Sequence, residues 1–79
     1  MSINVAVAKR VVQMCDELVA DYGSNKINGN QYGMRMSIIN RVAASANLPT
    51  HSMAITLAEI IRARLAASGH RERVWPIAS

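Results

Sequence analysis

Apolar residues recur at helical spacing over the first third of the chain. A first stripe falls at positions i, i+4, i+7, i+8, i+11 and i+15, which lie on one side of a helix: Val7, Val11, Met14, Cys15, Leu18 and Tyr22. A second stripe beside it repeats every seven residues: Val5, Val12 and Val19. Together the two stripes cover about 200° of a helix, whereas a helix packed on one side needs only about 100°. The pattern predicts a helix over about 2–22 that is covered from two directions, and a second copy of the chain would supply one of these covers.

Two later stretches show the same periodicity. The first predicts a helix over about 32–46 whose buried stripe contains Met34, Ile38, Val42 and Ala46, with Ile39 beside them. The second predicts a helix over about 51–68 whose buried stripe contains Met53, Leu57, Ile60, Ile61 and Leu65. The chain is therefore expected to form one compact all-α domain of three helices over residues 1–79, followed by an extended C-terminal tail over 69–79.

Helix boundaries are indicated by residues with special backbone preferences. We expect Gly23 and Asn47 to adopt the left-handed conformation that ends helices, and Gly69 to close the third helix. Pro49 prevents the second helix from continuing, and the hydroxyl of Thr50 or Ser52 is expected to cap the third.

Residues 24–33, SNKINGNQYG, separate the first two predicted helices. Asn28-Gly29 is a strong turn pair and is compatible with a small hairpin or with an open loop. A calcium loop is excluded because, with Gly29 at its sixth position, Lys26 and Arg35 would stand where carboxylates are needed. A phosphate-binding loop is excluded because no Lys-Ser or Lys-Thr follows Gly33. We interpret the segment as a joint that turns the second helix away from the first.

Composition narrows the class of protein. Apolar residues make up 51% of the chain, but no uninterrupted apolar run is long enough to cross a membrane. The start, MSINVAVAKR, lacks the pattern of a secretory signal, and Cys15 is the single cysteine, so we expect a cytoplasmic protein in a reducing compartment.

Charge is unevenly distributed along this basic chain. Residues 1–22 contain two basic and three acidic side chains, a net charge of −1, and residues 23–79 contain seven basic and two acidic ones, a net charge of +5, which gives the total of +4. The basic C-terminal part raises the possibility of an anionic partner such as nucleic acid.

Residues 42–56, VAASANLPTHSMAIT, carry a partial DNA-binding pattern. Ala43 stands at the small position of a first helix, Asn47 at the left-handed turn, Leu48 follows it, and Met53 stands at a buried position of a second helix. This stretch resembles the helix-turn-helix of bacterial and phage regulators. It departs from that pattern at polar Thr56, which falls on the second buried position.

The resemblance implies a DNA-binding regulator that uses residues 34–68. Contacts to the DNA would come from Arg35, Arg41, Thr50, His51, Ser52, Ile55 and Arg62, with the arginines at phosphates. The face expected to meet bases nevertheless lacks the Arg, Asn or Gln side chains that make bidentate base contacts. The alternative is an ordinary helix–loop–helix corner with the same capping chemistry.

Trp75 suggests a different function. A single Trp in an aromatic-poor chain, flanked by Val74 and Ile77, is a candidate anchor in a protein–protein interface. The apolar surplus of the first helix, at Val5, Val12 and Val19, is a second candidate contact surface. Alternatively, the tail folds back and covers the first helix.

Residues with catalytic or metal-binding chemistry are few. Cys15 lies within an apolar stripe, where thiols are usually inert, and neither His51 nor His70 has a partner at metal-ligand spacing. We therefore expect no enzyme, cofactor, metal or small-molecule substrate. The sequence favours a small interaction protein that forms a homodimer or binds a larger protein target, as an accessory factor or phage-type inhibitor does, and the DNA-binding regulator is the alternative.

Overall fold

The computed structural model describes residues 3–69, and these residues form three helices and no strands. The helices are α1 (Val5–Gly23), α2 (Gly29–Ser45) and α3 (Ala54–Ala67). The predicted all-α, three-helix architecture is therefore confirmed. The tail predicted beyond Gly69 lies outside the described residues, as do the interface candidates Val74, Trp75 and Ile77.

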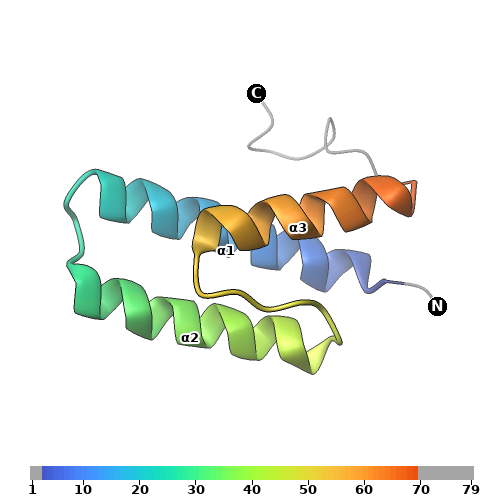
Figure 1. Ribbon diagram of the computed structural model, residues 1–79, viewed down its shortest axis with the longest axis horizontal. Coiled ribbons are helices and arrows are strands. Elements are labelled where there is room, and N and C mark those ends of the chain that lie inside the picture. Colours follow the sequence, from blue (N-terminus) through green and yellow to red (C-terminus); the bar gives the residue numbers. More distant parts are fainter. Residues whose placement is uncertain (1–2, 70–79) are drawn as a thin grey trace.

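α1 is the central helix of the fold. Both α2 and α3 pack against it, while α2 and α3 make few contacts with one another. Figure 1 shows that the chain reverses direction after α1, and that the linker of residues 46–53 runs back beside α2 before α3 begins. α2 and α3 consequently run in the same direction, opposite to α1.

Most of the core along α1 comes from the two predicted stripes, through the fully buried Val11, Val12, Cys15 and Leu18. Ala8, which belongs to neither stripe, is fully buried as well. The prediction that α1 is covered from two directions is confirmed, but both covers, α2 and α3, come from the same chain. The breadth of this apolar face therefore gives no support to a second copy as its cover.

The predicted buried stripe of α2 is wrong at Met34 and Ile38, which are 68% and 51% exposed. It is right at Ile39, which is buried together with Met36 and Ala43, and Val42 and Ala46 are partly buried against the core. α2 carries two apolar rows, and polar contacts select between them. With Ile39 facing inward, Tyr32 and Asn40 can both hydrogen-bond to the segment that leads into α3.

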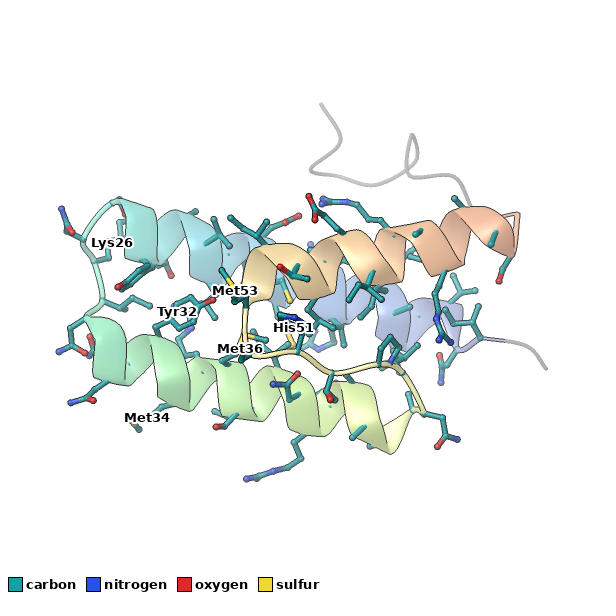
Figure 2. All side chains as sticks on the ribbon, viewed as in Figure 1. Lys26, Tyr32, Met34, Met36, His51 and Met53 are labelled. Atoms are coloured by element: carbon teal, nitrogen blue, oxygen red, sulfur yellow. The ribbon has the colours of Figure 1, made fainter. Side chains whose placement is uncertain are left out.

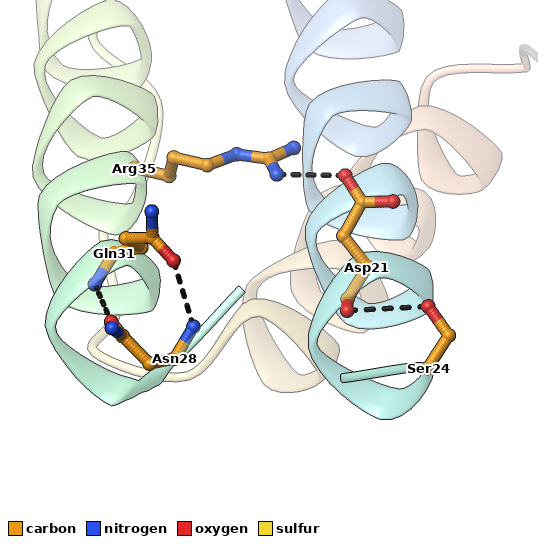
Figure 3. A network of polar contacts seen from close by, with 5 residues as sticks. All are labelled: Asp21, Ser24, Asn28, Gln31 and Arg35. Carbon is orange, nitrogen blue, oxygen red and sulfur yellow. Dashed lines mark hydrogen bonds and ion pairs between the residues drawn. The ribbon is translucent and has the colours of Figure 1, made fainter. Parts of the chain in front are cut away.

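α2 begins earlier than predicted, and the expected ten-residue connection shrinks to residues 24–28. Asn28 is the N-cap: its side chain accepts from the Gln31 amide at 2.9 Å, and the Gln31 side chain accepts from the Asn28 amide at 2.9 Å (Figure 3). This capping box replaces the possible hairpin. Gly23 belongs to α1, and the left-handed residue after it is Asn25, with φ of 62°.

α3 begins later than predicted and without the expected hydroxyl cap. Its N-cap is Met53, which makes no side-chain capping hydrogen bond, so the assignment of Thr50 or Ser52 as the cap is wrong. The Ala54 amide instead donates to the Tyr32 hydroxyl at 2.9 Å. The left-handed conformation predicted at Asn47 is confirmed, with φ of 59°, and Gly69, which follows α3, is left-handed as well, with φ of 86°.

The buried stripe of α3 is close to the prediction. Leu57, Ile61 and Leu65 are fully buried, and Ile60 is half-buried. Met53, expected at the start of this stripe, is 55% exposed because it precedes the first helical turn.

Candidate interaction surfaces

Residues 46–53, which would lie in the helix-turn-helix of the alternative function, form a linker held against α2. The Asn40 side chain makes two hydrogen bonds with the backbone of His51: its amide nitrogen donates to the carbonyl at 2.9 Å, and its oxygen accepts from the amide at 3.1 Å. Leu48, earlier in the linker, is buried in the core. Figure 2 shows His51 on this linker, between α2 and α3, and Tyr32 near the start of α3, where its hydroxyl accepts from the Ala54 amide.

His51 has a structural role within this linker. Its Nδ1 accepts a hydrogen bond from the Met53 amide at 3.0 Å, and its backbone is held by Asn40. The imidazole therefore satisfies an amide next to the N-terminus of α3. Thr50 and Ser52 are exposed on either side of it.

Two of the arginines expected at phosphates join the helices of this chain. Arg35 on α2 pairs with Asp21 on α1 at 2.8 Å, as Figure 3 shows. Arg62 on α3 pairs with Asp16 on α1 at 2.7 Å. Both pairs are about two-thirds shielded from solvent. Arg41 is exposed on α2. The predicted phosphate contacts are thus divided between one exposed arginine and two that hold α1 to its neighbours.

The helix-turn-helix arrangement implied by residues 42–56 does not match the observed geometry. Such motifs join two packed helices through a turn of about three or four residues. Here residues 46–53 separate α2 from α3, and the two helices pack on α1 instead of on each other. Near the start of α3, Ala54 is buried, while Ile55 and Glu59 are exposed. Neither of these exposed residues is an Arg, Asn or Gln, the side chains that make bidentate contacts to purine bases.

The valines proposed as a contact surface lie in or against the core. Val12 is fully buried, and Val5 and Val19 are partly buried and pack against the core. They are occupied by contacts within the chain because α2 and α3 together surround this side of α1.

A different set of apolar residues is exposed, and sequence reasoning missed most of it. Large apolar side chains reach solvent at Tyr22, Met34, Ile38, Met53 and Ile55. Met34 points away from α3 in Figure 2. Four of these residues, Tyr22, Met34, Ile38 and Met53, belong to apolar stripes that were predicted to be buried. The signal that could have identified Met34 and Ile38 was the presence of two apolar rows on α2, which cannot both be buried in a helix that packs on one neighbour.

A groove between α1 and α2 adjoins this exposed row. Its lining is partly apolar, from Met14, Ile38 and Ile39, and partly charged, from Arg10, Glu17 and Arg35. Arg35 is already neutralised by Asp21. The side chains of Arg10 and Glu17 make no hydrogen bond or ion pair within residues 3–69. The groove therefore combines apolar surface with one unpaired positive and one unpaired negative charge.

Cys15 lies in the α1 core as a free thiol. Burial and the neighbouring Asp16 carboxylate raise its pKa to about 11, against a smaller opposing effect of Arg62. The thiolate required for nucleophilic attack is therefore scarce at neutral pH. Within the described part of the chain, no group of three His, Cys, Asp or Glu side chains lies close enough to hold a metal ion. None of its helices combines the length and the apolar content needed to cross a bilayer.

No protein-family model, curated protein or solved structure matches this chain. The exposed residues themselves are consequently the basis for proposing a function.

Proposed function

We propose that this chain is a small, non-enzymatic helical protein that acts by binding another protein. The observation that carries this proposal is the exposed apolar row on α2, where Met34 and Ile38 are 68% and 51% exposed although the same helix buries a separate row. Transfer of a fully exposed side chain of this size out of water is favourable by about 1.5–3 kcal/mol. A partner that covers the row would gain the part of this free energy that corresponds to the exposed surface of Met34 and Ile38.

The chemistry of the exposed row suits a protein surface as its partner. Met34 and Ile38 stand one helical turn apart on α2, which is the spacing of anchors that dock a helix into an apolar surface. The flexible thioether of Met34 can adapt to an irregular surface. Such a protein would act as an accessory factor or an inhibitor on a larger target, and the free Cys15 thiol is compatible with a cytoplasmic setting.

The alternative, a DNA-binding regulator, is less well supported by the geometry. Arg35 and Arg62 form ion pairs with α1, and the exposed side chains at the start of α3 include Ile55 and Glu59. Its remaining support is the net charge of +4.

Affinity capture from lysate of the native cells tests the two functions. The chain is used as bait with and without nuclease, beside a variant carrying Met34→Gln and Ile38→Gln. The matched control is Ala44→Gln, an exposed position on α2 that lies outside the row of Met34 and Ile38. We expect a captured protein that survives nuclease treatment, is lost with the double variant and is kept with the control. Release of every captured protein by nuclease, or equal capture by the double variant, would contradict the proposal.

A further inference from the structure

The groove between α1 and α2 has the charge pattern of a surface that pairs with itself. Arg10 and Glu17 are two helical turns apart on the same side of α1, a separation of about 10 Å along the helix axis. At that distance they cannot form an ion pair with each other. The other acidic residues of α1, Asp16 and Asp21, are already paired with α3 and α2, so Arg10 and Glu17 are left facing outward.

A two-fold axis would satisfy both charges at once. If the α1 helices of two copies lie antiparallel, with the axis near Met14, Arg10 of each copy meets Glu17 of the other. Met14 is close to the midpoint between these residues and lines the same groove, as does Ile38. The apolar side chains would then lie at the centre of the contact and the ion pairs at its two ends. This is the order, apolar core and polar rim, that stable interfaces show.

We infer that the α1–α2 face binds a second copy of this chain, in an antiparallel homodimer held by Arg10–Glu17 pairs and by Met14 and Ile38. Two antiparallel helix pairs brought together in this way form a four-helix arrangement, a common way to bury apolar helix faces. The contact is isologous, because both copies use the same residues. It differs from the homodimer expected from the sequence, which placed Val5, Val12 and Val19 in the contact. The inference names one partner for the α2 surface and so rests on the proposed function.

Charge reversal tests this dimer in purified protein. We expect sedimentation equilibrium of the full chain to show a dimer. In Arg10→Glu, the new glutamate of each copy faces Glu17 of the other, so two negative charges meet. In Glu17→Arg, the new arginine of each copy faces Arg10 of the other, so two positive charges meet. The dimer dissociation constant of each single variant should therefore be at least about tenfold higher than that of the wild type. A mixture of the two variants restores an opposite pair at both ends, so it should form a heterodimer. The matched control for Arg10→Glu is Lys26→Glu, which makes the same change in net charge at an exposed position outside the groove.

Folding does not confound this comparison, because Arg10 and Glu17 are exposed. Circular dichroism should give the same helix content for all variants. A monomer at every concentration would overturn the inference, and so would single variants that dimerise as strongly as the wild type or a mixture that fails to associate. A monomeric wild type that still captures another protein through Met34 and Ile38 would overturn the dimer and leave the proposed function standing.

Cross-linking tests the position of the axis independently. In Met14→Cys the two introduced thiols lie close together across the proposed axis, and mild oxidation should join two chains. The buried Cys15 gives little background. Ala44→Cys, an exposed position on α2 away from the groove, is the control. Oxidation of Met14→Cys no faster than Ala44→Cys would exclude this arrangement even if the chain is dimeric.

Discussion

α1 and α2 are both amphipathic, but they are held in place differently. α1 is packed between two helices, and its broad apolar face leaves it few alternatives to its observed orientation. α2 packs on α1 alone among the helices and carries two apolar rows of similar character. We attribute its rotation to hydrogen bonds with the chain that leads into α3: the Tyr32 hydroxyl accepts from the Ala54 amide, and the Asn40 side chain bonds to the His51 backbone. Apolar burial thus orients the central helix, whereas polar contacts orient the peripheral one.

The comparison implies that the largest losses of stability come from truncations along α1. Leu18 is fully buried in the core, so Leu18→Ala removes apolar contacts and leaves a cavity. We expect it to lower the free energy of unfolding by about 3 kcal/mol, measured by chemical denaturation. Ala20→Gly, at an exposed position of the same helix, should lower it by about 1 kcal/mol or less. Equal losses for the two variants would show that α1 is not the centre of the core.

The next largest effect should come from the contact that orients α2. Asn40→Ala removes two hydrogen bonds to His51 and leaves the amide and carbonyl of that residue without them. We expect a loss of about 2 kcal/mol in the free energy of unfolding. Amide exchange should also accelerate at His51 and Ala54.

The control for this variant is Ser37→Ala, an exposed substitution one turn earlier on α2. It should leave both stability and exchange nearly unchanged, within about 0.5 kcal/mol. If Asn40→Ala behaves in the same way, hydrogen bonding does not determine the orientation of α2.

A pH titration probes the α1 core through Cys15. Its pKa is raised to about 11 in the folded chain from an ordinary value of 9.0, because the buried thiolate would be poorly solvated. Between pH 9 and about pH 11, the Cys15 thiol is therefore more often deprotonated in the unfolded chain than in the folded chain. The contribution of Cys15 therefore lowers stability as the pH rises above 9, by about 1 kcal/mol at pH 10.

The measurement is the free energy of unfolding at several pH values, compared between wild type and Cys15→Ala. The variant has lower stability overall because of its smaller side chain, but it lacks the thiol, so its stability should fall less steeply above pH 9. Identical slopes for the two proteins would show that the thiol is not buried when the chain is folded.

Local sequence patterns account for the parts of the fold that depend on neighbouring residues. Helix periodicity predicted all three helices, and the left-handed Asn47 was predicted because its backbone preference acts locally. Four of the five fully buried residues of α1 were predicted because they lie on its two apolar stripes, whereas Ala8 lies on neither and was missed.

Contacts between residues distant in sequence account for what was missed. The Tyr32 hydroxyl accepts a hydrogen bond from the Ala54 amide, 22 residues later in the chain. No local rule predicts that this hydroxyl, and not that of Thr50 or Ser52, binds the start of α3. The ion pairs of Arg35 and Arg62 likewise depend on how α2 and α3 lie on α1. The groove became apparent only once the rotation of α2 was known.

The smallest expected effect is also the most direct test of that rotation. Met34 belongs to the row that the sequence placed in the core and the structure places in solvent, while Met36, two residues later, is 4% exposed. Met34→Gln should change the free energy of unfolding by no more than about 0.5 kcal/mol, since it replaces an exposed side chain with another good helix former. Met36→Gln buries an amide in an apolar site and should cost about 2 kcal/mol or more. The reverse order would mean that α2 is turned the other way, with Ile38 inside and Ile39 outside. Because Ile38 lines the groove, that outcome would also remove the apolar part of the proposed dimer contact.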